Sequence, residues 1–156
     1  MKRKVMRFTF IIYCFLLAYC LFRREPFNVG KSYFDEILMN INIIPFNSIS
    51  QYLILLIDKT NPNLFYYALV NFAGNIVAFV PIGIYFPLFW ANFRNYLKFI
   101  FGAFIIIFVI EIVQLFTLTG SFDVDDLILN LIGASMGYLC YYFMKLHFIK
   151  QDFGNI

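Results

Sequence analysis

Charged side chains are scarce in this chain. Only 13% of its 156 residues are Asp, Glu, Lys or Arg, whereas 62% are hydrophobic, and the mean hydropathy is +0.78. Soluble domains average about 25% charged and about 45–50% apolar residues. The chain has too little polar surface to cover a water-soluble globule, so we predict an integral membrane protein. The net charge of +3 indicates no nucleic acid partner, because basic residues commonly flank membrane spans.

Sequence signatures of soluble-enzyme chemistry are also missing. There is no HExxH motif, no glycine-rich phosphate loop and no Ser-His-Asp set, and His147 is the one histidine. The three cysteines show no CxxC spacing and lie in apolar segments (Cys14, Cys20, Cys140). We therefore interpret them as small buried hydrophobic residues rather than as zinc ligands or disulfide partners. The sequence predicts no bound metal and no cofactor.

Long apolar runs are what the sequence does contain. They predict an all-α fold, an integral membrane bundle of four transmembrane helices in one domain over residues 1–156. The predicted spans are residues 5–22, 64–90, 99–119 and 126–144. In the long connection between the first two spans, apolar side chains recur at helical spacing (Ile49, Tyr52, Leu53, Leu56). That run is too short to cross a bilayer, so it predicts a short helix lying at the membrane interface.

Two further expectations concern the first span and the orientation of the bundle. We expect the first span to be a retained anchor, because the bulky Tyr19 before Cys20 does not suit a cleavage site. With four spans, the N-terminus, the 91–98 loop and the C-terminal tail share one side and carry eight basic residues. The other side carries four, so the positive-inside rule predicts that both termini are cytoplasmic.

Polar side chains within or beside the apolar spans are the candidates for a functional site. A carboxylate is costly in hydrocarbon, so Glu111 is expected to face the inside of the bundle and find a partner there. Gln114, three residues further on, is expected on the same helix face. In the predicted orientation these polar groups approach one level near the outer face. We therefore expect an outward-facing ligand pocket formed by Asn71, Asn75, Glu111, Gln114, Asp123, Asp125, Asp126 and Asn130.

Each of these residues also has a structural interpretation. Glu111 is either a general acid/base or binding group, or a protonated or hydrogen-bonded residue that holds helices together. The aspartates either bind a divalent cation with Glu111 or cap the following helix, and their spacing matches no known cation loop. Asn75 and Asn130 are candidates for hydrogen bonds between helices. Gly133 and Gly137 form a GxxxG motif, which predicts close helix packing.

Four short stretches, which follow one another in order along the chain, carry a resemblance to a known family. They are Asn42-Ile43-Ile44-Pro45-Phe46, Asn75-x3-Phe79-x-Pro81-x-Gly83, Glu111-x2-Gln114 and Ser121-Phe122-Asp123-Val124-Asp125-Asp126-x3-Asn130-x2-Gly133-x3-Gly137. Together they resemble the VanZ-like membrane proteins. Many relatives carry an arginine just before the acidic run, where this chain has Gly120 and Ser121. The departure weakens any idea that the acidic loop grips a phosphate.

The resemblance implies a multi-pass protein of the bacterial cytoplasmic membrane and cell envelope. The family includes a protein linked to teicoplanin resistance, which implies membrane lipid, a lipid-linked wall component or a glycopeptide as partners. The first hypothesis is therefore a non-enzymatic protein that binds an amphiphilic ligand and lowers the effect of the drug. The second is an intramembrane enzyme that acts on a lipid-linked substrate, with Glu111 as acid/base. The third is a purely structural or partner-binding bundle.

Cysteine labelling tests the predicted orientation. In a variant without the three native cysteines, Ser121→Cys should react with a membrane-impermeant maleimide added to intact cells, because the 120–125 turn is expected outside. The matched control is Asn92→Cys in the 91–98 loop, which should react only after lysis. The reverse labelling pattern would contradict the predicted orientation.

Overall fold

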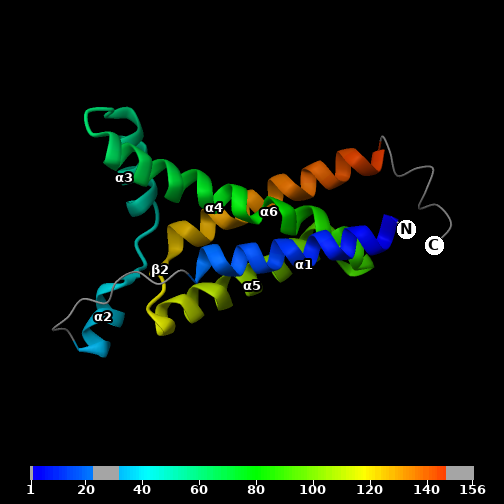
Figure 1. Ribbon diagram of the computed structural model, residues 1–156, viewed down its shortest axis with the longest axis horizontal. Coiled ribbons are helices and arrows are strands. Elements are labelled where there is room, and N and C mark those ends of the chain that lie inside the picture. Colours follow the sequence, from blue (N-terminus) through cyan, green and yellow to red (C-terminus); the bar gives the residue numbers. More distant parts are fainter. Residues whose placement is uncertain (1, 23–31, 147–156) are drawn as a thin grey trace.

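A computed structural model describes residues 2–22 and 32–146 of the chain and confirms the all-α prediction. His147 lies outside the described residues. The helices are α1 (Lys2–Leu21), α2 (Tyr33–Met39), α3 (Asn47–Ile57), α4 (Pro62–Phe89), α5 (Tyr96–Thr117) and α6 (Val124–Met144), with a 3-10 helix η1 (Ala91–Arg94). In Figure 1 the beginning of α1 and the end of α6 lie at one end of the molecule, and α2 and α3 lie at the other. We call the latter the α2–α3 end.

Within the described residues, four helices are long and apolar enough to cross a membrane, namely α1, α4, α5 and α6. Their bounds agree with the four predicted spans to within three residues at each end. The short helix predicted in the long connection is also present, as α3. At 28 residues, α4 is about 42 Å long, which exceeds a hydrocarbon core of about 30 Å. It runs continuously through both of its internal prolines.

Side-chain caps explain where three of the helices begin. Asn61 accepts hydrogen bonds from the backbone N–H groups of the first turn of α4, and Asn95 does the same for α5. Asp123 accepts from the Asp125 N–H at the start of α6. These side chains satisfy backbone donors that have no partner within the helix. The capping interpretation of the acidic run is therefore confirmed for Asp123.

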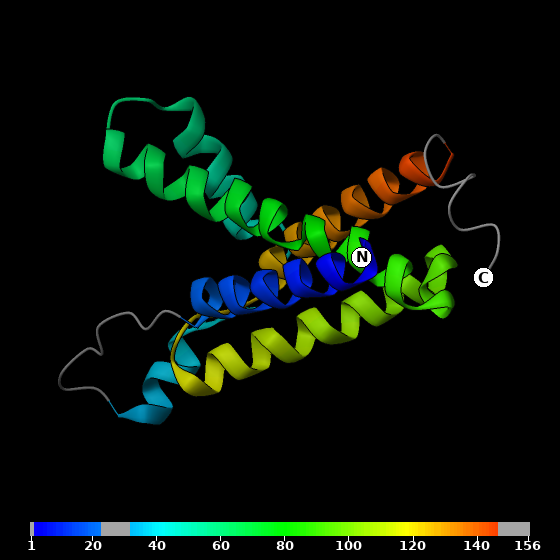
Figure 2. The ribbon, with the colours of Figure 1, turned by 45° about the vertical axis from the view of Figure 1, so that its right-hand side comes forward.

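The close crossing of α4 and α6 is the central packing contact (Figure 2). Added Cβ atoms on Gly133 and Gly137 of α6 would overlap the carbonyl oxygens of Ile76 and Val80 in α4. From the other side, a Cβ on Gly83 of α4 would overlap the backbone of α6. Small residues allow two helix backbones to approach in this way. The packing role predicted for the GxxxG motif is confirmed.

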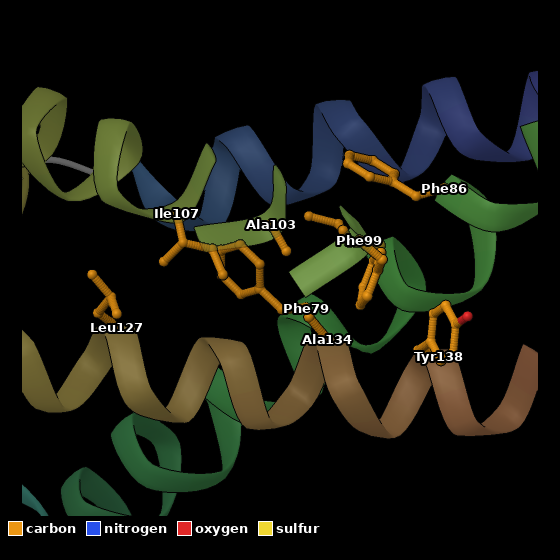
Figure 3. Close-up of a cluster of buried hydrophobic side chains, with 9 residues drawn as sticks. Phe79, Phe86, Phe99, Ala103, Ile107, Leu127, Ala134 and Tyr138 are labelled. Carbon is orange, nitrogen blue, oxygen red and sulfur yellow. The ribbon is translucent and has the colours of Figure 1, made fainter. Parts of the chain in front are cut away.

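Helix α5 completes an apolar core with α4 and α6 (Figure 3). Phe79 of α4 is fully buried against Phe99 and Ile107 of α5, and Phe99 stacks on Tyr138 of α6 with ring centroids 4.9 Å apart. By contrast, α1 has no buried residue in its described apolar window and only adds partly buried side chains at the edge of this core. Its Tyr13 hydroxyl donates to the Ala78 carbonyl of α4 at 2.7 Å. Helix α1 therefore lies beside a tighter unit of three helices.

Two features differ from the sequence expectations. Ile41–Asn42 (β1) pairs in parallel with Phe122–Asp123 (β2), a two-residue bridge too short to leave any periodic pattern in the sequence. The prediction that the cysteines are buried is wrong, because all three are exposed on spanning helices and are free thiols. A bundle this small has one narrow core, so most side chains of its spans, these cysteines included, lie on its surface.

Substitution of a crossing glycine should destabilise the bundle. Gly137→Ala places a methyl group against the Val80 carbonyl, so the helices must separate, and overpacking of this kind costs about 1–3 kcal/mol. Gly74→Ala in α4 is the matched control, because a Cβ there meets nothing within 4 Å. Thermal unfolding in detergent should show a lower midpoint for Gly137→Ala than for Gly74→Ala. Equal midpoints would contradict the proposed role of the crossing.

Candidate functional site

Four polar side chains gather between α4, α5 and α6 toward the α2–α3 end, and we call them the polar cluster: Asn75, Glu111, Asp126 and Asn130. The Asn75 Nδ2 atom donates to Asp126 Oδ1 at 2.6 Å, and the Asn130 Nδ2 atom donates to Glu111 Oε1 at 3.3 Å. Asp126 and Asn130 stand one turn apart on α6, so they share a helix face. Each amide–carboxylate pair therefore joins α6 to a different neighbouring helix.

Glu111 and Asn130 form the buried base of the polar cluster. Glu111 is 3% exposed and Asn130 is 1% exposed, whereas Asn75 and Asp126 are partly exposed. A lipid-facing carboxylate would be costly, so α5 turns Glu111 inward, where Asn130 donates to it. The partly exposed pair gives the cluster a side that a ligand can approach.

Carboxylate repulsion is not balanced by a nearby basic side chain. The carboxylates of Glu111 and Asp126 lie within electrostatic range of each other, and Asp123 acts on both. No Lys or Arg among the described side chains takes part in this interaction. Among the described side chains, the amides of Asn75 and Asn130 donate hydrogen bonds to these carboxylates. The cluster therefore favours a bound group that is positively charged or rich in hydrogen-bond donors.

One atom of the cluster is unsatisfied. Asn130 Oδ1 is a buried oxygen without a hydrogen-bond partner among the described residues. Its own amide nitrogen is already committed to Glu111, so the free oxygen belongs to the same polar surroundings. Buried acceptors of this kind almost always have a partner in folded proteins. The oxygen thus marks a place where a donor is expected.

Asp123 and Asp125 serve a different purpose, because their carboxylates hold the connection between α2 and α3. Asp123 accepts hydrogen bonds from Asn42 Nδ2 at 3.2 Å and from Ser48 Oγ at 2.6 Å. Asp125 is fully buried and accepts from the backbone N–H groups of Phe46 at 2.6 Å and of Ile49 at 3.0 Å. A carboxylate at the start of α3 suits the positive end of that helix.

The Asp125 carboxylate also holds a residue in an uncommon backbone conformation. Phe46 has φ 64°, in the left-handed region that bulky residues rarely adopt. Its N–H points to Asp125 and its carbonyl accepts from Ser50 in the first turn of α3. Both Asp125 oxygens are therefore used by the protein itself.

Like Asp123 and Asp125, two more of the predicted pocket residues lie outside the polar cluster. Asn71 donates to the Tyr67 carbonyl of its own helix at 2.8 Å. Gln114 donates to the Leu21 carbonyl of α1 at 2.8 Å. Residues three apart on a helix differ by about 60° around its axis, so Gln114 reaches α1 while Glu111 faces α6. Glu111 and Gln114 are therefore neighbours on α5 but bond to different helices.

Three residues near these carboxylates escaped the sequence analysis as site candidates: Asn42, Ser48 and Tyr52. All three lie in the connection before α4. Tyr52 is 8% exposed on α3, and burial first, then the nearby Asp126 carboxylate, raises the pKa of its phenol. The available signal was Asn42, which opens the first of the four family-like stretches.

The geometry does not support the hypothesis that the aspartates and Glu111 together bind a divalent cation. Residues 2–22 and 32–146 contain no group of three or more His, Cys, Asp or Glu side chains placed to hold a metal ion. The reason is the division described above, because Asp123 and Asp125 turn toward the connection rather than toward Glu111.

An apolar cavity of about 230 Å³ lies between α1, α4 and α5. Its lining includes Tyr13, Leu17, Leu21, Ile82, Ile106 and Ile110. Leu21 also accepts the hydrogen bond from Gln114, one turn of α5 beyond Glu111. The cavity and the polar cluster therefore lie along the same stretch of α5, on different sides of it.

Removal of the Asp125 carboxylate should release the connection. Asp125→Ala leaves the partly buried Phe46 and Ile49 N–H groups without this partner, at a cost of about 1 kcal/mol for each lost hydrogen bond. Asp58→Ala is the matched control, because Asp58 is exposed and accepts only from Thr60 nearby. Hydrogen exchange should speed up across residues 40–49 in Asp125→Ala alone. Unchanged protection there would contradict the anchoring role.

Comparison with known proteins adds one finding. The family model described as VanZ/LLP1 matches residues 10–145, which span five of the six helices in full and most of α1. No curated protein and no solved structure matches the chain. The matched region contains every residue of the polar cluster and both aspartates that anchor the connection. The chain belongs to the VanZ/LLP1 family.

Proposed function

We propose that this protein binds an amphiphilic molecule at the outer face of the bacterial cytoplasmic membrane and thereby lowers sensitivity to lipoglycopeptide antibiotics such as teicoplanin. The ligand is a lipid-linked wall component or the antibiotic itself. In this proposal both termini are cytoplasmic, so the α2–α3 end faces outward. In this role the protein catalyses no reaction. It holds either the antibiotic or the target of the antibiotic at the membrane surface.

The observation that carries the proposal is the pairing of an apolar cavity with a polar cluster along α5. An amphiphile has an apolar chain and a polar head, and it needs both kinds of surface within a short distance. The cavity between α1 and the other spans offers the first, at the depth of the apolar helices. Glu111, Asn130 and their partners offer the second.

The sparse packing of α1 against the other helices supports the same proposal. Helix α1 buries no residue in its apolar window, and its Tyr13 and Leu21 contacts bracket the cavity. A helix held by few contacts can move aside at modest cost, which gives a chain from the surrounding bilayer a lateral route into the cavity. The three remaining spans keep the polar cluster in place while α1 moves.

Drug sensitivity tests the proposed function. Deletion of the gene should lower the minimal inhibitory concentration of teicoplanin several-fold, and Glu111→Gln should have the same effect, because it removes a charge from the cluster without changing its shape. Asn71→Ala, which alters an amide outside the cluster, is the matched control. Equal membrane levels of each variant must be confirmed by immunoblot.

Vancomycin serves as the comparison drug in the same strains. A change for teicoplanin with little change for vancomycin agrees with recognition of an amphiphile. No change for either drug on deletion would overturn the proposed role. A loss of protein in Glu111→Gln but not in Asn71→Ala would instead favour a purely structural glutamate.

A further inference from the structure

The polar cluster holds more hydrogen-bond acceptors than donors. Its acceptors are four carboxylate oxygens and two amide oxygens, while its donors are the two amide NH₂ groups of Asn75 and Asn130. Asn75 directs one donor at Asp126, and Asn130 directs one at Glu111. No basic side chain among the described residues contributes a further donor. A bound molecule must therefore bring donors with it.

The unpaired Asn130 Oδ1 atom shows where such a donor belongs. This oxygen is buried on a side chain that is 1% exposed, and it lies beside Glu111 through the other arm of the same amide. Asp126 stands one turn away on the same face of α6. The polar cluster thus offers acceptors from two helices, namely Asn130 Oδ1 and the carboxyl oxygens of Glu111 and Asp126.

The chemistry of these acceptors selects among ligand classes. A phosphate or carboxylate would meet two carboxyl groups and no described basic side chain with which to pair. A multivalent metal ion usually takes six or more oxygen ligands, and no trio of acids here is placed to hold one. A primary ammonium group carries one positive charge and three N–H donors, which match three acceptors.

We propose that the polar cluster binds the primary ammonium group of an amphiphile, with Glu111, Asp126 and Asn130 as acceptors. The inference rests on the proposed function and specifies the head group of its ligand. The ammonium group approaches from the partly exposed side, past Asn75 and Asp126. Its charge replaces the missing basic partner, and its third N–H satisfies Asn130 Oδ1.

Binding of dodecylamine to the full-length protein tests this site. The protein is placed in phosphatidylcholine nanodiscs, which contain no primary amine, and equilibrium binding is compared with that of empty nanodiscs. Wild type should bind saturably. Glu111→Gln and Asp126→Asn each remove a charge-assisted hydrogen bond and should weaken binding at least about 10-fold. Asn71→Ala should bind like wild type, because its side chain bonds within α4.

Two further ligands separate the contributions of charge and of donors. Dodecyltrimethylammonium has the charge without N–H groups, and dodecanol has a donor without the charge. Both should bind at least about 10-fold more weakly than dodecylamine. Equal binding of all three, or equal binding of dodecylamine to wild type and Glu111→Gln, would show simple partitioning and overturn the proposal. Displacement of dodecylamine by low concentrations of sodium, magnesium or calcium chloride would indicate an inorganic cation site and would also overturn it.

A pair of Asn130 variants distinguishes loss of the binding site from loss of folding. Asn130→Asp keeps an oxygen at the unpaired position and adds charge, so it should retain dodecylamine binding, whereas Asn130→Ala should lose it. Size-exclusion profiles and unfolding midpoints establish that each variant is folded. Loss of binding in both Asn130 variants, with both folded, would contradict the assigned role of the Asn130 oxygen.

The source of the ammonium group is identified by competition. Nanodiscs made with phosphatidylethanolamine should weaken dodecylamine binding if a membrane lipid supplies the amine, and should leave it unchanged if a wall component or antibiotic does. Both results agree with an ammonium site. If deletion of the gene alters teicoplanin sensitivity but dodecylamine does not bind, the proposed function stands and the head-group inference fails. If dodecylamine binds but deletion of the gene leaves teicoplanin sensitivity unchanged, the ammonium site stands and the proposed function fails.

Discussion

The backbone contact between α4 and α6 is the constraint on which the rest of this structure depends. Gly133 and Gly137 bring α6 against the carbonyl oxygens of Ile76 and Val80. Asn75 is the residue before Ile76, and Asn130 lies one turn before Gly133. At this separation the short side chains of Asn75 and Asp126 meet at 2.6 Å. A wider crossing would separate Asn75 from Asp126. Each side chain would then lack its partner between apolar helices, where an unpaired polar group is costly.

The aspartates at the start of α6 divide two tasks between them. Asp123 and Asp125 accept hydrogen bonds from side chains and backbone of residues 42–49, and so hold a long connection against the bundle. Asp126 faces the other way, toward Asn75 and the polar cluster. A helical turn spreads adjacent side chains by about 100° each, so neighbouring aspartates inevitably serve different surroundings. This division explains why a dense acidic run forms no metal site of three acids in the described part of the chain.

The polar cluster differs from an ordinary interhelical hydrogen-bond network in its balance of charge. Amides that cross-link helices in membranes usually leave no net charge and few open acceptors. Here two carboxylates share one region, and a buried amide oxygen has no partner. Intramembrane ionisable groups with this character are commonly functional. In the proposed function, the cavity and the lightly packed α1 supply the apolar half of a site for an amphiphile.

The sequence by itself determined the four spans, the short α3 helix, the aspartate cap and the glycine packing of α6. Each of these depends on local composition, on helical periodicity or on residue size, which are readable along the chain. Only the tertiary structure decided that Gln114 turns to α1 while Glu111 turns to Asn130, and that Asn42 and Ser48 bind Asp123. Those partners are separated by 19 to 93 residues, and their contacts are set by the crossing of helices rather than by any spacing in the sequence.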